Sequence, residues 1–296
     1  MYESFAEDVA AAASVMPDLV HEVMAFIREK RFSFVRQDKV GLDGDVDIVT
    51  DIDREAQRMY RSRLALLTPH FGMIGEEDGL SVKCRYEGHD VYWTNDPIDG
   101  TEAFGRRQSH GVGTMLALVA DGAVVAACIG DICTGERYSY GPDDGGAWRI
   151  DSSGSRMALG LYPARPLSEH LVLLGQRPEL YSKATQHMIG LRANGGLFKY
   201  MEIDKGSIGI RMARLWKGEV GAVVLKARHE TPWDDTPLVG FCKKLGFKFL
   251  KQDGSGRFEE FAPKLVESPR KVAHETLIVH ESRLGDLRQW EQESRT

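Results

Sequence analysis

The chain has 296 residues, a formal net charge of -6 and 42% hydrophobic residues, a composition typical of an ordinary globular protein. The acidic balance argues against nucleic acid or an anionic membrane as a partner, and we expect no secretory signal and no apolar run of transmembrane length. The four cysteines form no CxxC pair, so we expect reduced thiols and a cytoplasmic location.

The first half predicts helices followed by an antiparallel meander. Apolar residues at three- and four-residue steps predict a helix over 3–30, which Pro17 breaks or kinks. A polar loop is expected over 37–47, and a second helix over 53–67. Period-two patterns predict a hairpin through Asp121-Gly122, and further strands after it continue an antiparallel meander. Its expected strands are 112–120, 123–130, 136–140 and 147–150.

After about residue 155 the pattern alternates between strands and helices. Strands are expected at 171–174, 221–225 and 277–279, and helices at 180–192, 207–216, 234–245 and the C-terminus. This order predicts an α+β half over 1–155 and an α/β half over 156–296, with a boundary near 150–165.

The most informative segment follows a short apolar strand predicted at 91–93. Asp96 and Asp99 are three residues apart and should lie at the bent exit of that strand. Carboxylate and carbonyl oxygens suit a hard cation such as Mg²⁺. Gly100 and Thr101 then open a helical turn whose free N–H groups can hold an anion. An acidic turn is the alternative, because Asp, Pro and Gly are common in turns for conformational reasons.

Four acidic clusters share this design, in which a short apolar segment is followed by carboxylates. They are Asp47–Asp53, Glu76-Glu77, Asp96 with Asp99, and Asp234-Asp235. If the fold brings them together, they offer oxygens for two or three metal ions, an arrangement that supports phosphoryl displacement. From the residues alone, a helix-capping role is the favoured interpretation of Asp234. The sequence contains no zinc-type Cys/His spacing, GxSxG motif or Walker A motif.

In these elements the chain resembles the inositol monophosphatase family, within the lithium-sensitive, Mg²⁺-dependent phosphatases. The matches are Val-Thr-Asp-Ile-Asp at 49–53, Ile-Gly-Glu-Glu at 74–77, Asp-Pro-Ile-Asp-Gly-Thr at 96–101 and Pro-Trp-Asp at 232–234. They occur in the family's order and cover roughly residues 5–250. The resemblance implies a layered αβαβα sandwich of the sugar-phosphatase type, and a homodimer.

The resemblance also implies two or three Mg²⁺ ions. Glu76, Asp96 and the Ile98 carbonyl would hold the first. Asp96, Asp99 and Asp234 would hold the second, and Glu76 would also face a weaker third ion.

The same resemblance implies catalytic roles. Glu76 and Thr101 would orient and deprotonate a metal-bound water, and Asp53 would accept a hydrogen bond from the Thr101 hydroxyl. The backbone N–H groups of Gly100 and Thr101 would receive the phosphate.

Two positions on the substrate side depart from the family. Ala227 stands where many inositol phosphatases place a glutamate that binds a ring hydroxyl, and Asp204 stands where a serine is common. We therefore expect a phosphate monoester hydrolase acting on inositol 1-phosphate or a related small polyol or sugar phosphate. Histidinol phosphate and a nucleotide 3′-phosphate are alternatives, as is a non-catalytic module that binds metal or a phosphorylated ligand.

Overall fold

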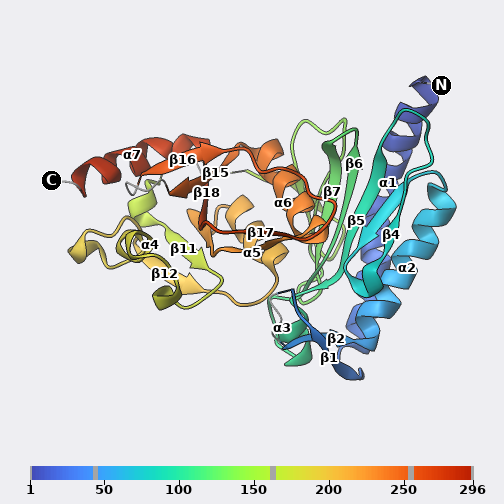
Figure 1. Ribbon diagram of the computed structural model, residues 1–296, viewed down its shortest axis with the longest axis horizontal. Helices are drawn as coiled ribbons and strands as arrows, with labels where there is room; N and C mark the ends of the chain where they lie inside the picture. The colour runs from blue at the N-terminus through green and yellow to red at the C-terminus, as the bar shows by residue number, and fades with distance from the viewer. Residues whose placement is uncertain (1, 43–45, 161–164, 253–256, 295–296) are drawn as a thin grey trace.

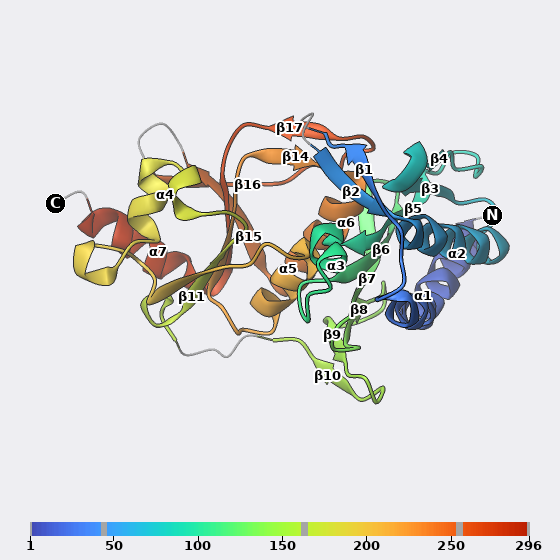
Figure 2. The ribbon, with the colours of Figure 1, turned by 90° about the horizontal axis from the view of Figure 1, so that it is seen from below.

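The computed structural model describes residues 2–42, 46–160, 165–252 and 257–294, and these form five layers in the order αβαβα (Figures 1 and 2). One pair of helices covers the outside of an eight-stranded sheet, a second pair lies between the two sheets, and a third covers the outside of a six-stranded sheet. The predicted layered sandwich is therefore confirmed. In that order, the helices are α1 (Tyr2–Lys30), α2 (Asp51–Leu67), α5 (Ile208–Trp216), α6 (Pro232–Leu245), α4 (Lys183–Met188) and α7 (Leu284–Glu293).

The eight-stranded sheet has the order β10-β9-β8-β7-β6-β5-β3-β4, in which only β3 and β5 pair in parallel. The predicted hairpin joins β6 to β7 through Asp121 and Gly122, both at positive φ (48° and 78°). The strands are β3 (Gly72–Gly75), β4 (Ser81–Val82), β5 (Val91–Asp99), β6 (Gly113–Ala120), β7 (Ala123–Asp131), β8 (Arg137–Tyr140), β9 (Trp148–Ile150) and β10 (Arg156–Ala158).

The six-stranded sheet has the order β12-β11-β13-β18-β15-β16. Its first three strands are parallel and the remaining pairs are antiparallel. Sequence patterns predicted only β11, β13 and β18, because β12, β15 and β16 have no regular alternation of buried and exposed positions. The strands are β11 (Leu171–Leu174), β12 (Tyr200–Ile203), β13 (Ala222–Leu225), β15 (Phe247–Gln252), β16 (Phe258–Phe261) and β18 (Thr276–His280).

Two short ribbons complete the structure. β14 (Arg228–Glu230) pairs with β17 (Arg270–Val272), and β1 (Arg36–Val40) pairs with β2 (Val46–Thr50). The expected polar loop over 37–47 was therefore wrong at both of its ends, although residues 43–45 lie outside the described part of the chain. β1 is almost wholly exposed, so its residues show no apolar alternation, and its pairing with β2 makes it a strand.

The helix predicted over 180–192 was also wrong in extent. Only α4 is α-helical, and single 3₁₀ turns lie on either side of it at Pro178–Leu180 and Arg192–Asn194. Gly195 ends the second turn in the left-handed conformation, at φ 86°. Met188 and Ile189 from this segment are buried in the core cluster that includes strands of the six-stranded sheet, whereas Leu180 and Leu191 are exposed.

Helix α1 continues through Pro17, so the predicted break does not occur. Burial of the flanking turns, including Met16 and Val20, holds the helix on the sheet. Over Phe5–Lys30 it is also long and apolar enough to cross a membrane by length and composition, with a mean hydropathy of 1.3, contrary to our expectation. In this structure its apolar face instead packs in the core between α1, α2 and the eight-stranded sheet.

The glycine at position 240 sets how closely α6 approaches the eight-stranded sheet. A Cβ added there would contact the Tyr140 hydroxyl and lie 2.8 Å from Val124 Cγ1. We predict that Gly240→Ala lowers the free energy of unfolding by about 1–3 kcal/mol, because the helix must move off the sheet. Chemical denaturation measures this change.

The matched control is Gly285→Ala, on α7, where an added Cβ has nothing within 4 Å. Removing a helical glycine there should leave stability unchanged or raise it by up to about 1 kcal/mol. Equal effects of the two substitutions would contradict the packing argument.

Candidate metal and phosphate site

Strand β5 carries two acidic residues into the buried interior. All nine of its residues are buried, and its pairing with β6 changes register between Asp96 and Asp99. This irregularity contains Pro97 and Ile98, and such bulges re-aim side chains. The strand predicted at 91–93 was therefore too short, because the aspartates belong to the strand itself. Pairing on both sides extends β5 beyond the point where its apolar pattern ends.

Three carboxylates converge at this point. Ligand oxygens of Asp96, Asp99 and Asp234 all lie within 4.8 Å of one another. Asp234 reaches the cluster from the first turn of α6, whose N-cap is Thr231. The Thr231 hydroxyl donates to Asp234 Oδ2 at 2.8 Å and accepts from the Asp234 N–H at 3.3 Å. Asp234 is therefore both a capping partner of the helix and a member of the acidic cluster.

Glu76 joins the cluster from the end of β3. Gly75 pairs with Asn95 in the parallel ladder, and the Glu76 N–H donates to the Asn95 carbonyl at 3.2 Å. This register sets Glu76 beside Asp96, the residue after Asn95. Burial raises the pKa of Glu76 to about 8, and the charges of Glu77 and Asp234 contribute to the rise, partly offset by Lys39.

The other three carboxyls have raised pKa values for the same reason. Burial raises the pKa of Asp96 well above its usual range, and the charges of Glu76, Asp99 and Asp234 add to this. Burial, with repulsion from Asp99, raises the pKa of Asp234 to about 7. The pKa of Asp99 is raised by burial, although hydrogen bonds from Ser207, Gly209 and Ile208 lower it in part.

The donor set fits a divalent cation. Asp96 Oδ1 is buried and has no hydrogen-bond partner in the described part of the chain, an expensive condition for a carboxylate. The surrounding groups are all oxygen donors, the ligands that Mg²⁺ and Ca²⁺ prefer. A cation among these oxygens would satisfy Asp96 and offset the burial and repulsion that raise the pKa values of Glu76, Asp96 and Asp234.

Lys39 on β1 is a residue that sequence reasoning missed. Its ammonium lies 3.0 Å from Glu76 Oε1 and 2.8 Å from Glu77 Oε1. Burial alone would lower the pKa of Lys39, but the two carboxylates outweigh it and raise that pKa. No sequence signal pointed to Lys39, because its position depends on the β1–β2 ribbon that was predicted as a loop.

The hydroxyl of Thr101 connects this cluster to helix α2. Its Oγ1 lies 3.2 Å from Asp53 Oδ1 and 2.9 Å from the Ile98 carbonyl, both acceptors. Asp53 is fixed by a capping box, in which the Thr50 N–H donates to Asp53 Oδ2 at 2.8 Å. Burial raises the pKa of Asp53 to about 6, against the lowering effect of the Thr50 hydrogen bonds. The predicted pairing of Asp53 with Thr101 is present in the structure.

Gly100 lies at a three-way backbone contact. Its φ is 88°, and an added Cβ would lie 2.5 Å from the Gly111 carbonyl oxygen and 2.8 Å from the Ser207 nitrogen. Only glycine fits both the conformation and the space. The Ser207 N–H donates to the Gly111 carbonyl at 2.8 Å, and the Ser207 hydroxyl donates to Asp99. The short helix α3 (Thr101–Gly105) begins directly after this contact.

The two substrate-side residues lie past the ends of β12 and β13, the strands on either side of β11. Asp204 follows β12 and is buried, with its Oδ1 accepting from the Gly206 N–H at 3.0 Å. Ala227 is half-buried between β13 and β14. The structure thus brings Asp96, Asp99 and Asp234 together, with Glu76 beside Asp96 and Thr101 hydrogen-bonded to Asp53. Asp204 and Ala227 follow strands of the other sheet.

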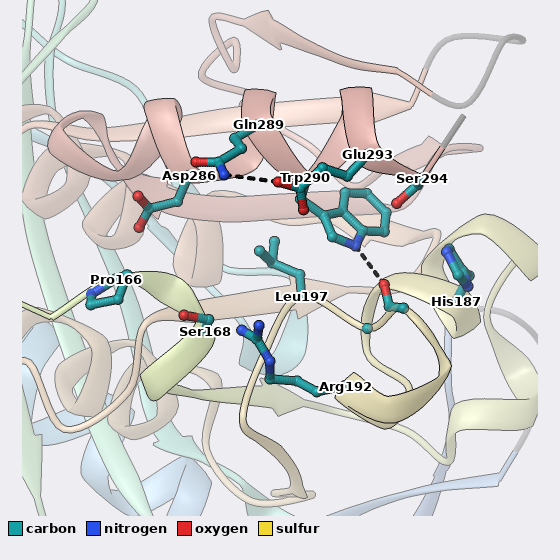
Figure 3. A pocket seen from close by; sticks show the side chains of 12 residues that line it. Pro166, Ser168, His187, Arg192, Leu197, Asp286, Gln289, Trp290, Glu293 and Ser294 are labelled. Carbon is teal, nitrogen blue, oxygen red and sulfur yellow. Dashed lines mark hydrogen bonds between the residues drawn. The ribbon is translucent and has the colours of Figure 1, made fainter. Parts of the chain in front are cut away.

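A pocket of about 360 Å³ lies elsewhere, between α7 and the segment around residues 187–197 (Figure 3). Trp290 donates its indole N–H to the Gly195 carbonyl at 2.7 Å, and its ring lies 5.7 Å from that of His187. None of the predicted site residues lines this pocket. This pocket is therefore separate from the acidic cluster.

The profile of one protein family, the inositol monophosphatase family, matches residues 8–286. The chain belongs to the inositol monophosphatase family. The resemblance inferred from four short elements is therefore confirmed over nearly the whole chain.

Curated relatives within this family include enzymes with different names. The inositol-1-monophosphatase of Rhizobium meliloti is 34% identical over 134 residues, which are 43% of this chain and 47% of that protein. The histidinol-phosphatase of Chlorobaculum parvum is 36% identical over 202 residues, 67% of this chain and 70% of that protein. The chain spans about half the length of several inositol-1-monophosphatases that it matches.

Solved structures of the family share the fold. An IMPase/NADP phosphatase complexed with NADP and Ca²⁺ superposes with a TM-score of 0.71 at 18% identity, covering 94% of this chain and 93% of that one. Mycobacterium tuberculosis SuhB has a TM-score of 0.67 at 22% identity, covering 96% and 97%. At these identities the likeness shows the fold alone.

The raised pKa values predict how stability depends on pH without metal. An acid whose folded-state pKa exceeds its unfolded value binds more protons when folded, so stability falls as pH rises between those values. From the unfolded value near 4 to the Glu76 value of about 8, the metal-free protein should lose stability. Asp96→Asn should raise stability at pH 8 by about 1–2 kcal/mol, measured by denaturation in chelator.

Added Mg²⁺ should stabilise the wild type at pH 8 and stabilise Asp96→Asn much less, because the variant lacks a carboxylate at the convergence point. Asp143→Asn, in an exposed loop, is the matched control and should behave as wild type. If the free energy of unfolding of the metal-free wild type did not change with pH, the carboxyls of the cluster would not have raised pKa values in the folded protein.

Proposed function

We propose that this chain is a Mg²⁺-dependent phosphate monoester hydrolase. The observation that carries the proposal is the convergence of Asp96, Asp99 and Asp234 within 4.8 Å, next to the Thr101–Asp53 pair. Membership of the inositol monophosphatase family supports it, and one solved family structure is an IMPase/NADP phosphatase complexed with Mg²⁺ and phosphate. Metal ions held by such carboxylates can stabilise both the attacking and the leaving oxygens of a phosphate ester.

Glu76, Asp96 and the Ile98 carbonyl would hold one Mg²⁺, and Asp96, Asp99 and Asp234 a second, as the family resemblance implies. When bound, such ions lower the pKa of coordinated water and neutralise charge on the attacking and leaving oxygens. In the structure, the Lys39 ammonium lies 3.0 Å from the Glu76 carboxylate and partly neutralises its charge, as a bound Mg²⁺ would. We propose that Lys39 and a cation share the Glu76 carboxylate.

Thr101 and Asp53 would orient the attacking water. With a pKa of about 6, Asp53 is ionised at neutral pH and accepts a hydrogen bond from the Thr101 hydroxyl. The Thr101 oxygen then has a lone pair free to accept a hydrogen bond from water. Glu76, once a bound cation and Lys39 favour its ionised form, would take the proton that the water loses. The N–H groups of Gly100 and Thr101 would hold the phosphate.

The substrate within this reaction class has three candidates. Inositol 1-phosphate or a similar small polyol phosphate follows from the family, and one solved relative is bound with D-inositol-1-phosphate. Histidinol phosphate follows from the Chlorobaculum parvum relative. A nucleotide 3′-phosphate was an expectation from the sequence, and a nucleotide, NADP, is bound in another solved relative. The departures at Asp204 and Ala227 bear on this choice rather than on the reaction.

A non-catalytic module that binds metal or a phosphorylated ligand is the alternative from another class. A relative that has lost activity is expected to lack at least one of the side chains that would bind metal or orient water. This chain retains all five of the side chains concerned: Glu76, Asp96, Asp99, Thr101 and Asp234. The retained set favours the enzyme.

We predict that Thr101→Val lowers kcat by about 100-fold, because the valine methyl cannot accept a hydrogen bond from water. Phosphate release with saturating Mg²⁺ measures this, across the three candidate substrates. Thr101→Ser keeps the hydroxyl and should retain most of the activity. Equal activity of the serine and valine variants would exclude the proposed role of the hydroxyl.

Asp96→Asn should abolish turnover while leaving the fold intact, because both proposed ions use Asp96. Circular dichroism verifies the fold of the variant. Hydrolysis by Asp96→Asn at wild-type rate would contradict the metal assignment. Mg²⁺ binding to wild type without hydrolysis of any phosphate ester would favour the non-catalytic module.

A further inference from the structure

The pocket between α7 and residues 187–197 has the dimensions of a small-molecule site (Figure 3). Its volume of about 360 Å³ is near the lower end of the range that ligand pockets span, about 300–1,000 Å³. Leu197, which is only 5% exposed, lies near the middle of the pocket in Figure 3. The ligand that such a pocket holds is therefore small, of the size of a single amino acid.

One face of α7 forms a wall of this pocket. Residues at steps of three and four fall on one side of a helix. Four such residues of α7 line the pocket: Asp286, Gln289, Trp290 and Glu293. The residues of this helix that are buried, Leu287 and Glu291, lie on the adjoining face. Helix α7 therefore packs on the protein with one face and presents polar and aromatic groups to the pocket with the next.

A closely packed backbone turn forms another wall. Gly195 is in the left-handed conformation, at φ 86°, and its N–H donates to the Arg192 carbonyl at 3.0 Å. A Cβ added at Gly196 would collide with the carbonyl oxygen of Gly190. The Trp290 indole N–H donates to the Gly195 carbonyl at 2.7 Å and joins this turn to α7. The two walls are therefore held in place by the protein itself.

Charged groups of opposite sign line the pocket without pairing to each other. Among the residues that the structure describes, Arg192 has no ion pair and no side-chain hydrogen bond, and Ser168 has no side-chain hydrogen bond. Asp286 is half-buried, and its Oδ2 accepts from the Leu167 N–H at 2.8 Å. Figure 3 shows Asp286 on the α7 side of the pocket, and Arg192 and Ser168 on the other side. A ligand between them would meet an anion on one side and a cation on the other.

The indole of Trp290 adds an aromatic surface to these charges. Its hydrogen bond to Gly195 fixes the ring, and the His187 ring lies 5.7 Å from it, tilted by 36°. Leu197 supplies an apolar contact in the same pocket. Aromatic rings pack favourably against an indole in tilted or offset geometries. The pocket thus combines an anion, a cation and an aromatic surface, the three groups that complement an aromatic amino acid.

We propose that this pocket binds an aromatic α-amino acid as a zwitterion. Arg192 and Ser168 bind its carboxylate, Asp286 binds its ammonium, and its ring packs against Trp290. An amine alone would leave Arg192 unpaired, and a carboxylate alone would leave Asp286 unpaired. A phosphate ester is disfavoured, because the carboxylates on α7 would repel a group with about two negative charges. The site is separate from the acidic cluster, so the inference does not rest on the proposed function.

Two matched sets of ligands test the inference by isothermal titration calorimetry on the full chain. L-phenylalanine is compared with phenethylamine, which lacks the carboxylate, and with 3-phenylpropanoate, which lacks the ammonium. L-tryptophan is compared in the same way with tryptamine and indole-3-propanoate. At least one amino acid should bind at millimolar concentration or below, with a Kd about tenfold lower than those of both its analogues, since each analogue loses one hydrogen-bonded charge.

Two substitutions locate the site. Asp286→Asn removes the charge, but its amide oxygen can still accept from the Leu167 N–H, so the turn is preserved. It should weaken binding of the amino acid about tenfold and leave binding of the carboxylate analogue unchanged or tighter. Arg192→Gln should weaken binding of the amino acid about three- to fivefold, the effect of one exposed charge. Circular dichroism verifies the fold of both variants.

The matched controls are Asp143→Asn and Arg177→Gln, because both residues are exposed and neither lines this pocket. They should bind the amino acid as the wild type does. The inference is overturned if neither amino acid binds, if the amines bind as tightly as the amino acids, or if the Asp286 and Arg192 variants bind normally. Loss of amino-acid binding in saturating Mg²⁺ and inorganic phosphate would place the ligand at the acidic cluster and overturn it too. None of these outcomes depends on hydrolysis.

Discussion

Mutual repulsion among buried carboxylates is the constraint on which this structure depends. Glu76, Asp96, Asp99 and Asp234 come together where burial raises the pKa of each, and the charges of neighbouring carboxylates add to the rise at Glu76, Asp96 and Asp234. The surrounding residues reduce this cost in part: three donors hold Asp99, Thr231 holds Asp234, and the Lys39 ammonium contacts Glu76. Perturbed carboxyls of this kind are typical of functional sites, and Asp96 Oδ1, which has no hydrogen-bond partner among the described residues, is free to bind a cation.

The layered fold separates the proposed reaction from the choice of substrate. β3 and β5, neighbours in the eight-stranded sheet, deliver Glu76 and the two aspartates, and α6 adds Asp234 from between the sheets. Asp204 and Ala227, the expected substrate-side residues, follow β12 and β13 of the six-stranded sheet instead. Ser207 joins the two parts, since it contacts both Asp99 and the backbone near Gly100. Residues past the strand ends can therefore change without altering the metal ligands.

The sequence was most informative where chemistry and local structure coincide. The hairpin at Asp121-Gly122 and the acidic elements could be predicted because turn residues and carboxylates occur at characteristic spacings. Residues positioned by pairing between distant segments could not be predicted. Lys39 was missed because β1 shows no apolar alternation, and the bulge in β5 depends on the pairing of that strand with β6. Arg211 was also missed, because a single arginine in an amphipathic helix gives no sign that Gly175 makes room to bury it.

Anomalous diffraction from crystals soaked in Mn²⁺ and inorganic phosphate tests the central claim most directly. The account predicts Mn²⁺ peaks bonded to oxygens of Asp96, Asp99 and Asp234, with a further peak at Glu76, and a phosphate against the N–H groups of Gly100 and Thr101. It also predicts that the Lys39 ammonium moves away from Glu76 or shares that carboxylate with the metal. Crystals with Mn²⁺ bound elsewhere, and none among these carboxylates, would contradict it.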